Sequence, residues 1–141
     1  MNHIPKQQWM GCAVATAAML ADRNYEEVAT HWPNLDEARM RSPQQLCALL
    51  ESVTGKDWHL SPVWYPKPRV REFVPPERSV AAWIQDDLFR PQFGQWIVFN
   101  GQFIYDPGQR TEHVVENYEL RNWYVTMVVQ PGLPEVEGSA A

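Results

Sequence analysis

The stretch Gly11-Cys12-Ala-Val-Ala-Thr-Ala-Ala-Met-Leu-Ala21 decides how this chain folds. It is rich in alanine, the residue with the highest helix propensity. Its small side chains let neighbouring elements approach the helix axis closely. We therefore predict a buried central helix that begins at Cys12 and against which the rest of the chain packs.

Two shorter helices are predicted after residue 21. Asn24-Tyr-Glu-Glu27 has the form of a capping box, and Pro33 ends the helix that it opens. Ser42-Pro43 begins the next helix, and Gly55 stands where its C-terminal stop belongs. Between them, apolar residues recur at the helical spacing, at Leu46, Leu49, Leu50 and Val53. Cys47 lies inside this helix and is predicted to be a small core residue.

The proline-rich middle of the chain is predicted to hold an edge strand and one more helix. Trp58-His-Leu60 has strand character, and the prolines that follow confine it to the edge of a sheet. The basic cluster Lys67-Pro-Arg-Val-Arg71 is interpreted as exposed surface. Ser79 is the predicted N-cap of a helix with one apolar face, which consists of Val80, Trp83, Ile84 and Leu88.

The C-terminal half is predicted to be an antiparallel sheet. Asn100-Gly101 separates the apolar runs 95–99 and 102–105, and this arrangement is the strongest short signal for a β-hairpin. Residues 123–129 are a third predicted strand, and 113–120 a fourth. Helices followed by strands predict one α+β domain over residues 1–130, with a flexible tail over 131–141.

Length, charge and cysteine content limit the classes of protein that fit the chain. It has 141 residues, one domain by length, and its net charge of −5 argues against a nucleic-acid binder, which needs a basic face. No apolar run reaches the roughly 18–20 residues of a membrane span, and the first residues lack the layout of a signal peptide. Two cysteines make no disulfide framework, so we expect a cytoplasmic protein. The histidines are scattered, so we expect no metal and no other cofactor.

Several segments resemble papain-like cysteine peptidases, most closely the bacteriocin-leader-peptidase-like branch and its small relatives in bacterial and phage genomes. The resemblance spans about residues 5–30, 42–55 and 94–107, in the order of the family. The segments that carry it are Gly11–Leu20, Ser42-Pro-Gln-Gln-Leu46, Gly94-Gln-Trp-Ile-Val98 and Ile104-Tyr-Asp-Pro107. The last two resemble the family's Gly-His-Trp-Val-Val and Tyr-Asp-Pro. This resemblance implies a papain-like fold, in which an N-terminal helical lobe packs on a C-terminal antiparallel sheet.

The resemblance also implies a role for three residues. Cys12 matches the nucleophile, and its place at a helix start favours the reactive thiolate because of the helix dipole and the free N–H groups. Asp106 matches the group that orients the catalytic base, although Asp-Pro-Gly also makes a good turn without any catalytic role. Gln95 stands where the family has the base, a histidine. An inert, buried Cys12 is the competing interpretation.

The oxyanion hole and the walls of the cleft are also assigned from the resemblance. The family's oxyanion glutamine lies about six residues before the cysteine, and that position holds Lys6. Gln8 and Gln7 are adjacent and are the candidates here. Trp9 and Trp96 are the predicted aromatic walls of the cleft. The other tryptophans are interpreted as core residues.

Gln95 decides the functional prediction. A carboxamide does not titrate near neutral pH, and losing a positioned base costs about 10²–10⁴-fold in rate. We therefore predict a degenerate, papain-like protein that binds a peptide or a partner protein in the former cleft. The oligomeric state stays open.

Two other functions stay open at this stage. The first is an active cysteine peptidase or amidase, in which Gln95 is an engineered replacement, or His113, then His59, replaces the base, or the match at residue 95 is out of register. The second is a structural subunit of a larger assembly, such as a phage particle, with exposed tryptophans as anchors.

Overall fold

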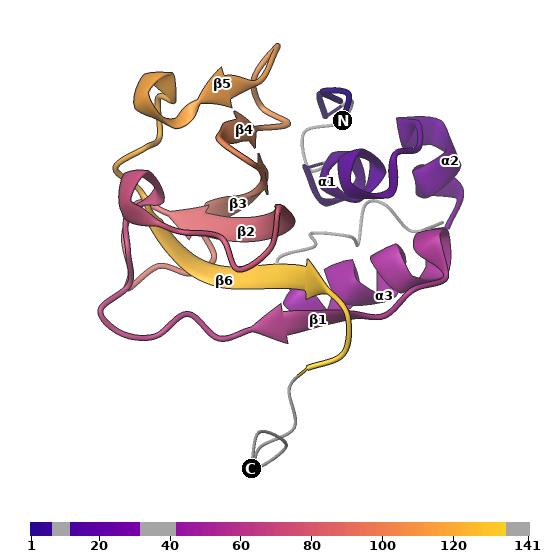
Figure 1. Cartoon of the computed structure of the whole chain (residues 1–141), viewed down its shortest axis with the longest axis horizontal. Helices are drawn as coiled ribbons and strands as arrows, with labels where there is room; N and C mark the ends of the chain where they lie inside the picture. The colour runs from indigo at the N-terminus through magenta and orange to yellow at the C-terminus, as the bar shows by residue number, and fades with distance from the viewer. Residues whose placement is uncertain (7–11, 32–41, 135–141) are drawn as a thin grey trace.

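The computed structural model of the chain describes residues 1–6, 12–31 and 42–134, and it has an α+β architecture (Figure 1). Within these residues there are three α-helices: α1 (Cys12–Ala21), α2 (Tyr25–Thr30) and α3 (Pro43–Thr54). The strands are β1 (Trp58–Ser61), β2 (Ser79–Gln85), β3 (Gly94–Asn100), β4 (Phe103–Tyr105), β5 (His113–Val114) and β6 (Tyr124–Pro131). Two short 3-10 helices, Val70–Glu72 and Val115–Asn117, lie in the connections.

The six strands form one antiparallel sheet in the order β1-β6-β2-β3-β4-β5. One face packs against the helices through side chains such as Ala81, Trp83 and Val129. The opposite face is covered by the connections that contain the 3-10 helices, through Val70 and Tyr118. The sheet therefore lies between a helical layer and a layer of loops.

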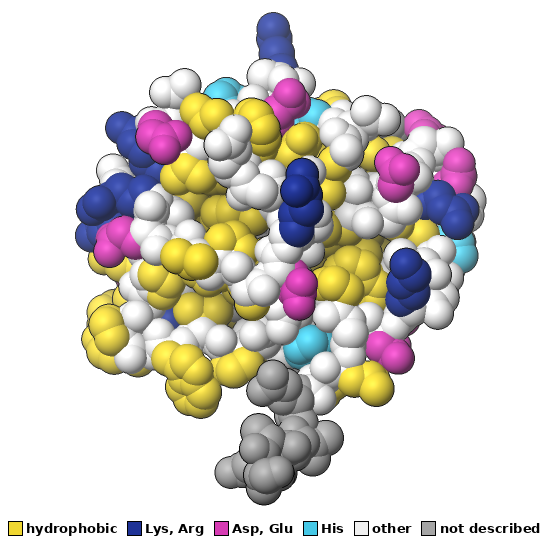
Figure 2. Space-filling view, in the orientation of Figure 1, with side chains coloured by type: hydrophobic (Ala, Val, Ile, Leu, Met, Phe, Trp, Pro, Cys, Tyr) yellow, Lys and Arg dark blue, Asp and Glu magenta, His cyan; other side chains and the backbone are white. Residues whose placement is uncertain are grey.

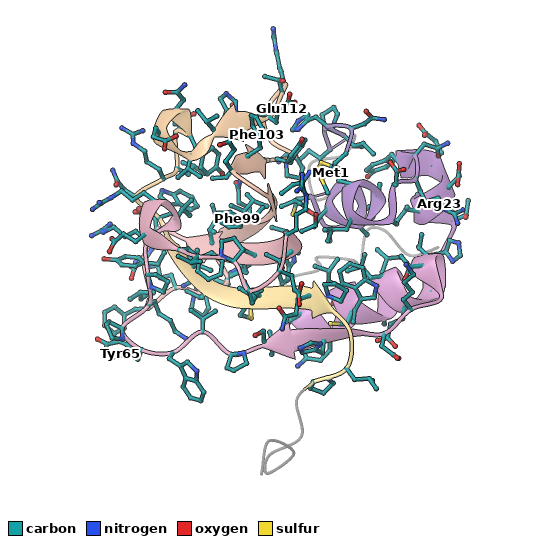
Figure 3. All side chains as sticks on the ribbon, viewed as in Figure 1. Met1, Arg23, Tyr65, Phe99, Phe103 and Glu112 are labelled. Atoms are coloured by element: carbon teal, nitrogen blue, oxygen red, sulfur yellow. The ribbon has the colours of Figure 1, made fainter. Side chains whose placement is uncertain are left out.

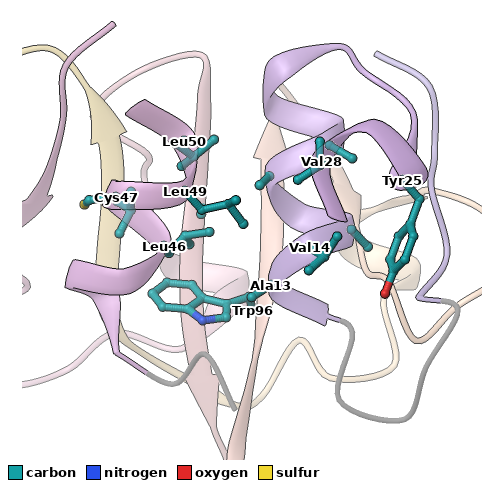
Figure 4. Close-up of a cluster of buried hydrophobic side chains, with 14 of the residues drawn as sticks. Ala13, Val14, Tyr25, Val28, Leu46, Cys47, Leu49, Leu50 and Trp96 are labelled. Carbon is teal, nitrogen blue, oxygen red and sulfur yellow. The ribbon is translucent and has the colours of Figure 1, made fainter. Parts of the chain in front are cut away.

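Helix α1 is as central as its composition predicts. Its residues from Ala13 to Met19 are all buried. The ring of Trp96 lies between α1 and α3, where it contacts the same cluster as Leu46 and Leu49 (Figure 4). Small side chains on α1 leave room for this large ring, so the alanine-rich sequence and the buried tryptophan explain each other.

The predicted helix boundaries after residue 21 are confirmed where they are described. The Asn24 side chain accepts a 2.8 Å hydrogen bond from the Glu27 backbone N–H and donates one of 2.8 Å to the Glu27 carboxylate. The first bond is the N-cap bond of a capping box, whereas the Glu27 carboxylate pairs with the Asn24 side-chain amide instead of its backbone N–H. Helix α3 has proline at its start and ends at Gly55, whose φ of 71° is left-handed. Pro33 lies outside the described residues.

The helix predicted after Ser79 is wrong, because residues 79–85 form the central strand β2. Ala81 and Trp83 face the helical layer, whereas Val80 and Ile84 face the loop layer. A strand buried on both faces shows no alternation of polar and apolar residues, so its apolar run resembles one face of a helix. Tertiary burial decides between the two.

The other predicted strands are found with altered lengths. The hairpin at Asn100-Gly101 is confirmed, with Asn100 paired to Phe103, and β1 is an edge strand as predicted. The strand predicted over 113–120 is limited to β5, after which the chain turns into a 3-10 helix. β6 extends to Pro131; residues 135–141 of the predicted tail lie outside the described residues.

Candidate functional site

Cys12 is half-buried at the first residue of α1, where this helix packs against β3. Burial raises the pKa of its thiol, and the negative charge of Asp106 raises it further. Backbone hydrogen bonds with Trp96 and Ala13 and the positive charge of Lys6 act in the opposite direction, but desolvation dominates. The thiol is therefore protonated and weakly nucleophilic at neutral pH, contrary to what its helix position alone predicts.

Gln95 lies at the start of β3 and is bonded to Asp106, directly after β4. The Gln95 Nε2 donates a 2.7 Å hydrogen bond to Asp106 Oδ2. Gly94, just before it, has no room for a side chain, because a Cβ there would lie 2.5 Å from the Ile84 carbonyl oxygen and 2.7 Å from the Trp83 ring. The close approach of Trp83 fixes the backbone from which Gln95 projects.

Asp106 is the centre of a buried polar cluster, which we call the Asp106 cluster: Gln95, Asp106, Gly108 and Tyr118. Asp106 is only 1% exposed. Its Oδ2 also accepts a 2.6 Å hydrogen bond from the Tyr118 hydroxyl, and its Oδ1 accepts one of 2.7 Å from the Gly108 backbone N–H. Three donors therefore compensate for the burial of the carboxylate.

Both sequence interpretations of Asp106 fit this geometry. Oδ1 bonds the N–H two residues ahead, which is the turn chemistry of an Asp-Pro-Gly sequence, and the Asp106 carbonyl accepts a further 2.9 Å bond from the Gln109 N–H. Oδ2 accepts the hydrogen bond from the Gln95 side-chain amide. One carboxylate thus shapes the turn and orients Gln95.

The structure brings Cys12, Gln95 and Asp106 to one end of the sheet. Cys12 bonds the backbone of Trp96, the residue after Gln95, and its thiol feels the charge of Asp106. The Lys6 backbone N–H donates a 2.9 Å hydrogen bond to the Pro107 carbonyl, so the N-terminal segment lies beside the same turn. The positive charge near the thiol therefore comes from a segment that precedes α1.

The other predicted members of the site have different outcomes. Gln7, Gln8 and Trp9 lie outside the described residues. The Trp96 ring does not line a cleft, because it is 0% exposed and packs in the core, edge-on to Trp83. The prediction for Trp96 is wrong because its side chain points into the helical layer, the opposite direction from Gln95.

All four histidines lie in the described part of the chain, and none has a hydrogen bond or ring contact with Cys12. His113, the candidate substitute base, lies on β5, which is separated from β3 by β4. The His59 ring is hydrogen-bonded to the Gly132 carbonyl and to the Gln130 side chain, at the end of β6. The contacts are Gln109 and Tyr105 for His3, Ser52 for His31, Gly132 and Gln130 for His59, and Tyr118 for His113.

Tyr118 is the site residue that the sequence did not indicate. Burial and the neighbouring Asp106 carboxylate raise the pKa of its hydroxyl strongly, so it remains a hydrogen-bond donor. It belongs to a 3-10 turn at the edge of the loop layer, with no motif around it. Only its contact with Asp106, 12 residues away in the chain, reveals its part in the site.

Neither a protein-family model nor a curated protein matches this chain. Within the described residues, no three potential metal-binding side chains lie close together. None of the described helices is both long and apolar enough to span a membrane.

Proposed function

We propose that the protein is a catalytically degenerate papain-like protein that binds a peptide or a partner protein at the end of the sheet occupied by Cys12, Gln95 and Asp106. The observation that carries the proposal is the 2.7 Å hydrogen bond from the Gln95 amide to the buried Asp106. A papain-like enzyme requires a titratable base in this position. The amide keeps the positioning contact and lacks the proton chemistry.

The state of Cys12 supports the same conclusion. Burial keeps the pKa of the thiol above its usual value, so the thiol is protonated at neutral pH. An active cysteine peptidase has the reverse arrangement, in which a nearby imidazolium lowers the pKa of the thiol. We therefore infer that this end of the sheet binds without cleaving.

The β2–β3 loop supplies an apolar contact surface close to Gln95. Phe89 is 94% exposed and Phe93 is 62% exposed, and Phe93 lies two residues before Gln95. The Trp83 indole N–H anchors the loop by a 3.1 Å hydrogen bond to the Pro91 carbonyl. Exposed aromatic side chains on an anchored loop are suited to hold an extended peptide.

Hydrolysis and alkylation assays on the wild-type protein test the loss of activity. We expect no Cys12-dependent cleavage of a peptide library. We also expect iodoacetamide to modify Cys12 no faster than free cysteine at pH 6–7, with the rate rising only under alkaline conditions. Cys12→Ala is the control for both assays. Cleavage that Cys12→Ala abolishes would refute the proposal and identify an active peptidase.

Peptide display on the folded protein tests the binding. We expect peptides selected on the wild type to lose at least about tenfold in affinity on the Phe93→Ser variant. Leu133→Ser, which changes an exposed apolar side chain after β6, is the matched control and should leave the affinity unchanged. Equal binding to wild type and Phe93→Ser would contradict the location of the site.

A further inference from the structure

A second surface lies on the face of the sheet opposite the helices, in the connection from β1 to β2. A hollow of about 380 Å³ opens there, and both limbs of the connection line it. The walls are Pro62, Trp64, Pro66 and Pro68 from the first limb and Val74 and Pro76 from the second. We call this hollow the proline groove. Its residues belong to neither the Asp106 cluster nor the β2–β3 loop.

Trp64, which lines the proline groove, and Tyr65, the next residue in the chain, are both largely exposed. Trp64 is 79% exposed and Tyr65 84%, whereas Trp96 is completely buried. Figure 3 shows Tyr65 at the outer end of the connection, and Figure 2 shows hydrophobic side chains gathered at the same corner. Val74, on the second limb, is also 84% exposed. A contiguous apolar patch of this kind marks an interaction site.

The two aromatic residues also carry unused hydrogen-bond donors. Neither the Trp64 indole N–H nor the Tyr65 hydroxyl bonds another residue in the described part of the chain. By contrast, the indole N–H groups of Trp58 and Trp83 are bonded, to the Thr54 hydroxyl and the Pro91 carbonyl. A ligand that fits the proline groove therefore offers backbone carbonyls as acceptors.

The connection that forms the proline groove carries a positive net charge, in a protein with a net charge of −5. The Lys67 ammonium donates to the carbonyl of Val63, which lines the groove, so its charge is held at the rim. The Arg69 guanidinium stacks 4.7 Å from the Tyr124 ring centroid. Over residues 62–78 the charged side chains are Lys67, Arg69, Arg71 and Arg78 against Glu72 and Glu77. This balance favours an acidic ligand.

We propose that the proline groove binds an extended, proline-containing acidic segment of a partner protein. Such a segment adopts the polyproline II conformation, which has no internal hydrogen bonds and docks in grooves lined by aromatic side chains. Its prolines pack against Trp64 and the prolines that line the groove, and its carbonyls accept from the Trp64 indole N–H. Its carboxylates pair with Lys67. This inference does not depend on the function proposed for the Cys12 end.

Fluorescence anisotropy with three labelled peptides tests the proposal. The probes are repeats of Pro-Pro-Glu, Gly-Gly-Glu and Pro-Pro-Lys, each about twelve residues long, which is close to four turns of polyproline II. We expect the Pro-Pro-Glu repeat to bind with a dissociation constant below roughly 100 µM and the other two at least about tenfold more weakly. Failure of Pro-Pro-Glu to bind better than Gly-Gly-Glu would overturn the proposal.

Two variants and a control locate the binding. Trp64→Ala and Lys67→Glu should each weaken the Pro-Pro-Glu complex at least about tenfold, and Lys67→Glu should improve binding of Pro-Pro-Lys. Leu133→Ala, which removes a comparably exposed apolar side chain after β6, should bind like the wild type. Circular dichroism checks that each variant is folded. Wild-type affinity in Trp64→Ala overturns the proposal. The proposal is also overturned if the wild type does not bind the Pro-Pro-Glu peptide but binds anionic lipid vesicles or self-associates, and Trp64→Ala abolishes that binding or self-association.

Discussion

The Asp106 cluster and the proline groove differ in how far their polar and aromatic side chains are exposed and in whether those side chains are hydrogen-bonded within the chain. In the cluster, a carboxylate is 1% exposed and three donors within 2.7 Å hold it. In the groove, an indole ring is 79% exposed, with no bond to its N–H in the described residues. A buried charge requires partners inside the same chain, whereas an exposed aromatic ring can find its partner in another molecule.

This difference separates structural residues from interaction residues. The Asp106 cluster joins β3, the turn after β4 and the loop layer, so its hydrogen bonds stabilise the fold whether or not a ligand binds. The exposed groove residues, such as Trp64 and Val74, bury little surface in the fold, so they matter mainly when a partner is present. Substitutions in the two regions should therefore affect different measurements.

Asp106→Ala should cause the largest loss of stability. It leaves the Gln95 amide, the Tyr118 hydroxyl and the Gly108 N–H without their acceptor, at a cost of about 3–5 kcal/mol in the free energy of unfolding. Urea denaturation measures this difference. The exposed Asp86→Ala is the control and should change the free energy by less than about 0.5 kcal/mol. A loss below about 1 kcal/mol for Asp106→Ala would show that the cluster does not stabilise the fold.

Alkaline pH should destabilise the protein through its buried thiols, with an intermediate effect. Burial raises the pKa of Cys47 from 9.0 to about 11, and burial raises that of Cys12 as well. Between pH 9 and about 11 the unfolded chain therefore holds fewer protons on these thiols than the folded chain, so stability falls as the pH rises. We expect a loss of about 1–2 kcal/mol for Cys47 across this window.

Urea denaturation at several pH values, under reducing conditions, checks this pH dependence. Cys47→Ala should show a shallower decline than the wild type above pH 9, because its contribution to proton release is absent. For each protein, the decline is measured from its own free energy of unfolding at pH 7. This removes the constant loss that Cys47→Ala causes through weaker packing. An identical slope for the two proteins would contradict the role of Cys47.

Trp64→Ala should have the smallest effect on stability. A side chain that is 79% exposed buries little apolar area, so we expect a change of less than about 0.5 kcal/mol. Trp96→Ala, in the core, is the matched contrast and should cost about 3–5 kcal/mol. Thermal unfolding of both variants gives the comparison. A large loss for Trp64→Ala would mean that the groove is part of the structural core, and the contrast between the regions would fail.

Local signals in the sequence predicted the elements whose residues interact with near neighbours. The capping box at Asn24, the stop at Gly55 and the Asn100-Gly101 hairpin depend on contacts within a few residues, and all three are found. β2 was predicted as a helix because its apolar run carries no information about which layers cover it. The sheet's position between two layers turns the same residues into a central strand.

The candidate site shows the same division. Cys12, Gln95 and Asp106 were found from a motif-level resemblance, and the bond between the last two is present. Tyr118 was missed because its role depends on one contact that no spacing rule anticipates. Trp96 was assigned to a cleft because aromatic character alone does not distinguish a wall from a core.

By itself, the sequence determined the starts of α1, α2 and α3, the hairpin and the absence of a titratable side chain at position 95, because these follow from residue type and short-range geometry. Only the tertiary structure decided that the Cys12 thiol is protonated, that Asp106 is enclosed by three donors, and that Trp64 is exposed while Trp96 is buried. The physical reason is that burial and electrostatic environment arise from segments far apart in the chain. The free-energy cost of a polar group and the pKa of a titratable group depend on that environment and not on residue type alone.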